Sequence, residues 1–372
     1  MRTAVILASM LCLTAPAPTA AYDIRTRIKI GNKTIFYLDD VHESITRLAE
    51  QCLPPLGAPR PTRCWTRDRA IADLATSEAG ESYSPRELAA RWPDDPTRQS
   101  AIHTSPKLGY MLKFGCKKRA EGGPSIEKIG LTCSSHFGRL QFMHAMAGPD
   151  DRSARDTYDR IIAWARFAYR VASREQDLTQ NYCKAFDDPK LSPALRKAFQ
   201  MEDRSFCSKR TRWLFWSYPA WTVRTLFTLT CSNPLQSKTC REDETDQADE
   251  QARLAATGAL LHLVQDSFSQ AHAHRSVDGS VDERGPFSSR VVCRFPTDYF
   301  DYSVQTDGLS EKIHQAADKP PQQIDDTCRD RPQTDDVVTA SAAVLWHLAE
   351  KKPADTFVQY LTERVFGPRP RA

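Results

Sequence analysis

One segment carries three metal-binding side chains at short spacing. In Leu260–Arg275, His262 and Asp266 are four residues apart and are followed by His272. Residues at i and i+4 share one face of a helix, so this pair predicts that two side chains on a rigid helix coordinate the same cation. The preceding turns are apolar, which predicts that the pair is buried, and a buried carboxylate requires a metal, a cation or a hydrogen bond. The alternative interpretation is a buried His–Asp hydrogen bond without a metal.

A second pair repeats the spacing. His314 and Asp318 are four residues apart in EKIHQAAD, with alanines between them. Taken alone, this pair is typical of a solvated helix face. Together with the first pair, it offers ligands for a second ion.

The order of these motifs resembles that of the zinc-dependent phospholipase C and fungal single-strand nuclease superfamily, which folds as one helical domain with three zinc ions. His262-x3-Asp266-x5-His272 resembles its central motif, and His314-x3-Asp318 resembles the pair that follows. Three upstream residues also resemble family positions in the same order: His42 in VHESIT, Asp94 in Trp-Pro-Asp, and His136 in SSHFGRL.

The resemblance implies a role for each of these residues. His136, His262 and Asp266 would hold a first zinc ion, and His272, His314 and Asp318 a second. His42 would join the mature N-terminal amine on a third ion, and Asp94 would act as a base or orient water. The chain departs from the family at its start, because 19 residues separate the expected first residue, Tyr22, from His42. We therefore expect two zinc ions, and a third only if Asp39, Asp40 or Glu43 replaces the amine. Asp95 is an alternative to Asp94.

The resemblance implies a zinc-dependent phosphoric ester hydrolase. Zinc lowers the pKa of bound water toward neutrality, which makes hydroxide available for in-line attack on phosphorus. The expected substrate is a phospholipid or another small phosphoester. Single-stranded nucleic acid is the alternative, since Trp213, Trp216 and Trp221 could stack bases, although core packing is the ordinary role of such aromatics. A non-enzymatic, secreted zinc-binding helical module is the rival hypothesis from another class. We expect a monomer without stable membrane insertion.

Helical periodicity dominates the elements that must position these residues. It predicts helices over 42–51, 85–92, 155–174, 248–266, 335–351 and 354–366, with proline-bearing loops between them. The predicted fold class is all-α: one large helical domain over 22–366 of the phospholipase C/nuclease type, stapled by disulfides and with long loops. Residues 173–247 are expected to form an insertion, and residues 367–372 a flexible tail.

The first 21 residues predict a cleavable signal peptide, with Arg2, an apolar run from Ala4 to Leu13 and small residues before Tyr22. Ten cysteines remain after Cys12 is removed, and an even number in an exported chain predicts disulfides between sequence neighbours. The expected location is periplasmic or secreted. The formal charge of +4 is too small to indicate nucleic-acid binding by itself.

Four other histidines are not expected to bind the metal or are weaker candidates for it. His103 and His144 lack ligand spacing and are expected to be surface or packing residues. His274 could replace His272, although the spacing favours His272. His347 is expected at the edge of the core.

Overall fold

A computed structural model shows a mostly helical protein with a few short strands. The structure describes residues 27–30, 33–36, 41–65, 83–94, 134–136, 138–191, 193–199, 210–212, 216–218, 222–228, 246–275, 290–301, 323–324, 327–330 and 332–371. The predicted signal peptide, Asp39, Asp40, Asp95, His103, His314 and Asp318 lie outside these residues, as do Trp213, Trp221 and the side chain of Trp216.

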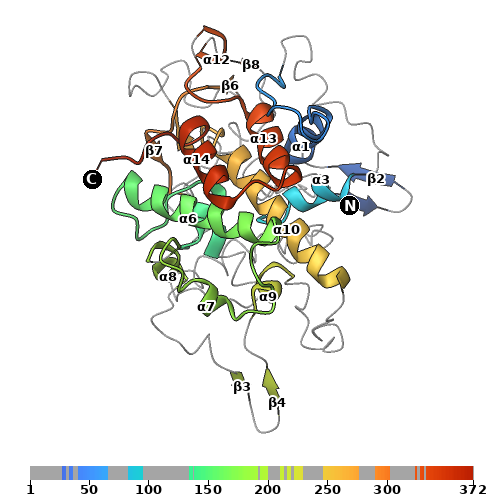
Figure 1. Cartoon of the computed structure of the whole chain (residues 1–372), viewed down its shortest axis with the longest axis vertical. Helices are drawn as coiled ribbons and strands as arrows, with labels where there is room; N and C mark the ends of the chain where they lie inside the picture. The colour runs from blue at the N-terminus through green and yellow to red at the C-terminus, as the bar shows by residue number, and fades with distance from the viewer. Residues whose placement is uncertain are drawn as a thin grey trace, which may run out of the picture.

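The helices follow one another along the chain as shown in Figure 1. They are α1 (Val41–Gln51), α3 (Pro85–Ala90), the 3-10 helix η1 (Gln141–His144), α6 (Ala154–Ala172), α7 (Tyr182–Ala185), α8 (Ala194–Ala198), α9 (Val223–Phe227), α10 (Asp246–Asp266), α12 (Thr327–Asp330), α13 (Val337–Ala349) and α14 (Ala354–Arg364). The six helices expected from periodicity are α1, α3, α6, α10, α13 and α14, and each is confirmed to within two residues at both ends.

The strands form four small two-stranded sheets. Three are antiparallel: β1 (Arg27–Ile30) with β2 (Lys33–Phe36), β3 (Arg210–Arg212) with β4 (Trp216–Tyr218), and β5 (Ala273–His274) with β7 (Asp298–Tyr299). The fourth pairs β6 (Arg290–Val291) in parallel with β8 (Gln323–Ile324). Pairing of β5 with β7 fixes the chain just after His272, because the Phe300 amide donates to the His272 carbonyl.

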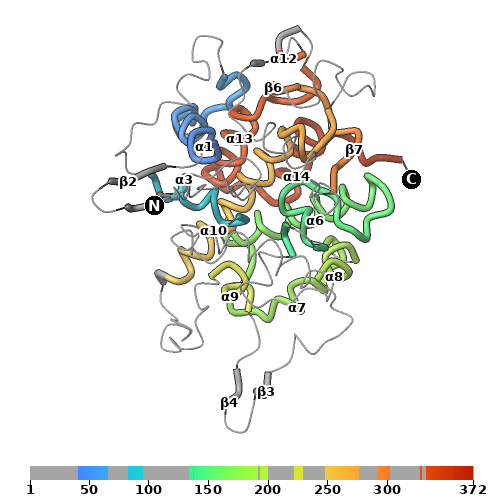
Figure 2. Tube along the Cα trace, turned by 180° about the vertical axis from the view of Figure 1, so that it is seen from behind, coloured from blue at the N-terminus to red at the C-terminus, as the bar shows by residue number. Residues whose placement is uncertain are grey.

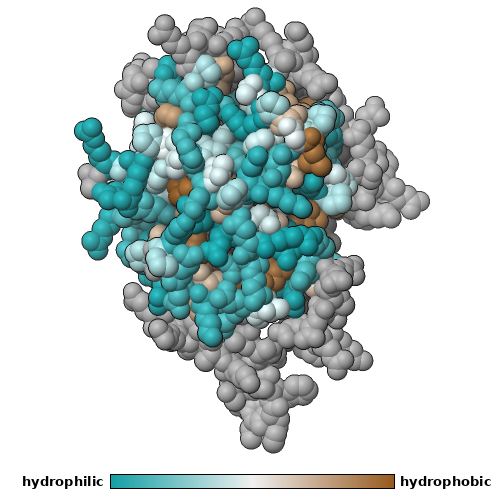
Figure 3. Space-filling model, viewed as in Figure 1, coloured by the Kyte–Doolittle hydropathy of each residue, from teal (hydrophilic) through white to brown (hydrophobic). Residues whose placement is uncertain are grey.

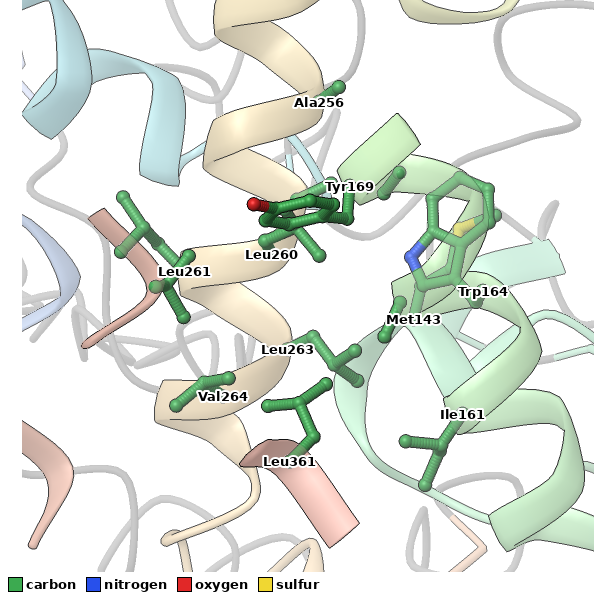
Figure 4. Close-up of a cluster of buried hydrophobic side chains, with 14 of the residues drawn as sticks. Met143, Ile161, Trp164, Tyr169, Ala256, Leu260, Leu261, Leu263, Val264 and Leu361 are labelled. Atoms are coloured by element: carbon green, nitrogen blue, oxygen red, sulfur yellow. The ribbon is translucent and has the colours of Figure 1, made fainter. Parts of the chain in front are cut away.

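Helix α10 lies at the centre and the other long helices pack around it (Figures 1 and 2). Its last three turns, Ala255 to Asp266, are buried on all sides, which explains why this part of the helix is apolar around most of its circumference. In Figure 4, Leu263 points toward Ile161 of α6, whereas Leu261 points to the opposite side of α10. Burial of a leucine side chain contributes about 2 kcal/mol, so this double-sided packing fixes the position of the last turn of α10.

A close backbone approach joins α3 to α10. A Cβ atom added at Gly258 would lie 1.8 Å from the Ala89 carbonyl oxygen, so only glycine fits there. Helix α3 begins with a capping box, in which Ser84 and Glu87 satisfy each other's backbone amides, and it ends just before Trp92 and Asp94. The short helix thereby brings Asp94 toward α10.

Two of the predicted disulfides lie within the described residues: Cys52–Cys64 and Cys293–Cys328. Both join sequence neighbours, as expected. Cys183 is also disulfide-bonded. The remaining predicted pairs involve cysteines outside the described residues.

The expected insertion, residues 173–247, contributes to the core where it is described. Phe186, Phe199 and Phe227 are buried, and their rings lie within 6.4 Å of aromatic rings of α6.

The face shown in Figure 3 is mainly hydrophilic, with isolated apolar residues. Among the described helices, none combines the length and apolar character needed to cross a bilayer.

Candidate metal centre

Seven histidine and aspartate side chains from distant parts of the sequence meet beside the end of α10. They are His42, Asp94, His136, His144, His262, Asp266 and His272. Six of them are buried, and the side chain of His136 retains 15% exposure. Six of the eight residues predicted for the site are therefore brought together, and the other two, His314 and Asp318, are not described.

The centre of the group is a triangle of three ligand-type atoms. His262 Nε2 lies 2.9 Å from Asp266 Oδ2, and His144 Nδ1 lies 3.0 Å from each of these atoms. Asp94 Oδ1 lies 3.7 Å from His262 Nε2 and 3.8 Å from His144 Nδ1. Ligand atoms of a tetrahedral zinc ion with bonds of 2.0–2.1 Å are about 3.3 Å apart, so these separations fit such an ion.

Hydrogen bonds on the outer side of the rings fix which nitrogen faces the centre. His262 Nδ1 lies 2.8 Å from the Ala90 carbonyl oxygen, and a carbonyl can only accept, so Nδ1 carries the hydrogen. When the ring is neutral, it therefore presents a lone pair on Nε2 toward Asp266. This arrangement, with one nitrogen bound to a backbone carbonyl and the other facing a cation, is typical of metal-binding histidines.

His42 is held in a similar way, whereas in His272 the nitrogen that donates to a backbone carbonyl is also the one nearest Asp266. Gln265 Oε1 accepts from His42 Nδ1 at 2.6 Å, which places His42 Nε2 3.4 Å from Asp266 Oδ1. The His42 and His262 rings stack with centroids 3.9 Å apart. His272 Nδ1 donates to the His144 carbonyl at 2.7 Å and lies 3.5 Å from Asp266 Oδ2.

The electrostatics of the group favour a cation at its centre. Burial raises the pKa of Asp266 to about 7, although His262 opposes the increase. Burial also disfavours a charged His262, but the charges of Asp266 and Asp94 outweigh it and raise the pKa of His262 to about 9. A buried carboxylate beside an imidazole lone pair is repulsive unless a proton or a metal ion lies between them.

The other two central residues are in the protonation states that a metal requires. Burial first, and then neighbouring imidazoles, hold the pKa of His144 well below its ordinary value, which leaves the ring neutral. Burial opposes ionisation of Asp94, but His262 and His136 outweigh it and lower its pKa. Among the described residues, Asp94 Oδ2, Asp266 Oδ1 and His144 Nε2 are buried and have no hydrogen-bond partner. These residues can hold a metal ion.

His144 was not predicted as a site residue. It is buried on η1, at 2% exposure, and the left-handed backbone of Ala145 (φ 53°) ends the helix directly after it. The spacing of ligands along a helix could not identify it, because its nearest partners, His262 and Asp266, are more than 100 residues away. The available signal was a lone histidine between apolar residues in QFMHAM, which indicates a polar group carried into the core.

The remaining predictions can be compared with the structure. His136 contacts Asp94, with Nε2 3.4 Å from Oδ1, whereas His144 occupies the place beside His262 and Asp266 that the resemblance assigned to His136. His274 lies outside the centre and contacts Thr297, so His272 is the histidine that reaches it. The carboxylate of Glu43 is engaged by Arg91.

No protein-family model matches the chain, and comparison with curated proteins and with solved structures gives no significant match.

Proposed function

We propose that this protein is a zinc-dependent hydrolase of phosphate esters, related to the zinc-dependent phospholipase C and single-strand nuclease superfamily. The observation that carries the proposal is the buried triangle of His144 Nδ1, His262 Nε2 and Asp266 Oδ2, with sides of 2.9–3.0 Å. Histidine nitrogen and carboxylate oxygen in this arrangement suit zinc better than magnesium or calcium, which prefer oxygen ligands.

The protein's own residues would supply a rigid ligand set. His144, His262 and Asp266 hold the ion, and Asp94 adds a charged oxygen beside it. This placement favours a ligand role for Asp94 over the water-orienting role that the resemblance implies. When bound, zinc lowers the pKa of a coordinated water and stabilises negative charge on phosphate oxygens. Fixed tautomers at His262 and His42 keep the geometry ready before substrate arrives.

A second function is favoured by one observation. His262 and Asp266 are fully buried, and four protein donors lie near one point, as in a structural zinc site whose coordination positions are all filled by protein. A non-enzymatic helical module that uses zinc for stability would have this arrangement. Activity separates the two functions, because only a catalytic site turns over substrate.

The test combines metal analysis with a substrate panel. The purified protein is expected to contain zinc and to hydrolyse at least one of bis-p-nitrophenyl phosphate, phosphatidylcholine and single-stranded DNA. His262→Ala is expected to reduce turnover by at least about 100-fold, more than the loss usual for a residue behind a ligand. His274→Gln is the matched control, since this histidine lies outside the centre, and its activity should equal wild type. Zinc content without turnover of any substrate would favour the structural module.

A further inference from the structure

Gln265 places a polar side chain inside the packed core. It precedes Asp266 in α10 and is fully buried. It also follows Leu261 by four residues, so it lies on the face of α10 that Figure 4 shows turned away from α6. A buried amide costs free energy unless its donors and its acceptor are hydrogen-bonded, whereas an apolar side chain avoids this cost. The presence of glutamine here therefore needs an explanation other than core packing.

The amide of Gln265 connects three helices at the candidate metal centre. Its oxygen, Oε1, lies 2.6 Å from Nδ1 of His42 in α1. Its nitrogen, Nε2, lies 3.0 Å from the Thr46 hydroxyl of the same helix and 3.5 Å from the Ser341 hydroxyl of α13. All three partners are buried. The glutamine thus adds polar contacts to the packing of α10 against α1 and α13.

The direction of the Gln265 amide is set from α13. Ser341 Oγ lies 2.8 Å from the Val337 carbonyl oxygen, which can only accept, so the serine hydrogen is donated to it. The hydroxyl therefore faces Gln265 as an acceptor, and the amide presents its NH2 group there. This contact is long, but the reversed amide would place two acceptor oxygens against each other. The amide oxygen is then left for His42, whose Nδ1 carries the hydrogen.

We propose that Gln265 is a positioning residue of the metal centre and that Ser341 sets the orientation of its amide. Together they hold His42 with its hydrogen on Nδ1 and the lone pair of Nε2 toward Asp266. The inference rests on the metal centre of the proposed function, but it does not depend on which reaction the centre performs.

The orientation of the amide selects between two states of the contact between His42 and Asp266. With the amide reversed, its NH2 group would donate to Nδ1, and Nε2–H of His42 would donate to Asp266 in a His–Asp hydrogen bond without a metal. With the amide as observed, a neutral His42 points a lone pair at the carboxylate, which is repulsive unless a proton or a metal ion lies between them. The separation of 3.4 Å between Nε2 and Oδ1 exceeds the 2.7–2.9 Å of a charge-assisted hydrogen bond. The network therefore favours a cation over a direct hydrogen bond.

Zinc affinity and the tautomer of His42, both measured on the full chain, test this inference. Competition with a chromophoric chelator gives the affinity. Two-bond proton–nitrogen correlation spectra of zinc-loaded protein with isotope-labelled histidine give the tautomer, and His42→Gln assigns the signals. Wild type is expected to carry the His42 hydrogen on Nδ1. Gln265→Met keeps an unbranched side chain but removes the amide, so it is expected to bind zinc about 10–100-fold more weakly and to reduce the population of this tautomer.

Further variants separate positioning from packing. Gln265→Glu keeps an oxygen for Nδ1 and should restore most of the affinity that Gln265→Met loses, as in carboxylate–histidine–zinc triads. Ser341→Ala removes the group that orients the amide and should lower the affinity by a smaller factor. Gln176→Met is the matched control, because it makes the same change at a buried glutamine that contacts Gln180, and its affinity should equal wild type. Circular dichroism of the metal-free variants confirms that the fold is retained.

The outcomes distinguish this inference from the proposed function. If Gln265→Met binds zinc as wild type does, if Gln265→Glu fails to restore a lost affinity, or if wild-type His42 carries its hydrogen on Nε2, the inference is overturned. If the loss and the rescue are observed but wild type hydrolyses no phosphate ester, the inference stands and the proposed function fails. If wild type hydrolyses a phosphate ester and Gln265→Met keeps its zinc affinity, the reverse holds. A wild-type protein that binds no zinc would contradict both.

Discussion

Replacement of Gly258 by alanine should damage the candidate metal centre without changing any of its histidine and aspartate side chains. The added Cβ would lie 1.8 Å from the Ala89 oxygen and 2.2 Å from its carbonyl carbon, and both are backbone atoms that cannot rotate away. An ordinary contact at this point is about 3.4 Å, so α3 must move away from α10 by roughly 1.6 Å. The same movement carries Ala90 and Asp94 away from His262.

The energetic cost follows from three effects. Gly→Ala in a helix interior gains about 1 kcal/mol from helix propensity. Overpacking against a backbone costs about 1–3 kcal/mol or more, and loss of the 2.8 Å bond from His262 to the Ala90 carbonyl costs about 1–3 kcal/mol. The expected net change is a loss of about 1–5 kcal/mol in the free energy of unfolding. Because the Ala90 carbonyl fixes the His262 ring, zinc affinity should fall about 10–100-fold.

Two measurements on Gly258→Ala test these values. Guanidinium unfolding of the metal-free protein gives the stability, and competition with a chromophoric chelator gives the zinc affinity. Thr257→Ala is the control, since it changes the adjacent position of α10 and removes only a bond from its hydroxyl to the Arg253 carbonyl. If Gly258→Ala were as stable as wild type and bound zinc equally well, the close approach of α3 would not position the centre, and the reasoning would be refuted.

Three further predictions concern stability. Burial lowers the pKa of His347 to about 4, so the fold is most stable above pH 6.5, where this histidine is neutral in both the folded and the unfolded chain. The free energy of unfolding should fall by up to about 3 kcal/mol as the pH falls from 6.5 toward 4. His347→Gln should flatten this pH dependence, measured by pH-jump unfolding. Asp336 caps α13 through the amides of Val338 and Thr339, so Asp336→Ala should lower stability by about 1 kcal/mol in urea titration, and an unchanged midpoint would contradict this. Replacing Cys293 and Cys328 by serine opens a 35-residue loop and should cost about 4 kcal/mol, measurable by calorimetry against the oxidised protein.

The helices of this fold could be predicted because their signals are local. In α6, the apolar residues that recur at helical spacing, such as Ile161, Ala165 and Ala168, are the ones that are buried. The apolar surroundings of His262 and Asp266 likewise predicted their burial correctly. Disulfides between neighbours, such as Cys52–Cys64, follow from short spacing along the chain.

The candidate centre was harder to predict from the sequence because its contacts join residues that are far apart along the chain. His144 lies on a 3-10 turn with no second ligand at helical spacing, and only the folded chain brings it 3.0 Å from His262. The close approach at Gly258 was also invisible, since one glycine in an alanine-rich helix reads simply as a weak helix position. The role of Asp94 could not be separated from that of a water-orienting base without the distances to its neighbours.

The central position of α10 has a consequence for the time at which metal can be acquired. In the triangle of His144, His262 and Asp266, His144 lies 118 and 122 positions along the chain from the other two residues, so the unfolded chain does not hold the three donors together. Binding of the proposed ion would then follow compaction of the helices around α10, and its free energy would be added almost entirely to the native state. Kinetically, zinc should slow unfolding far more than it accelerates folding.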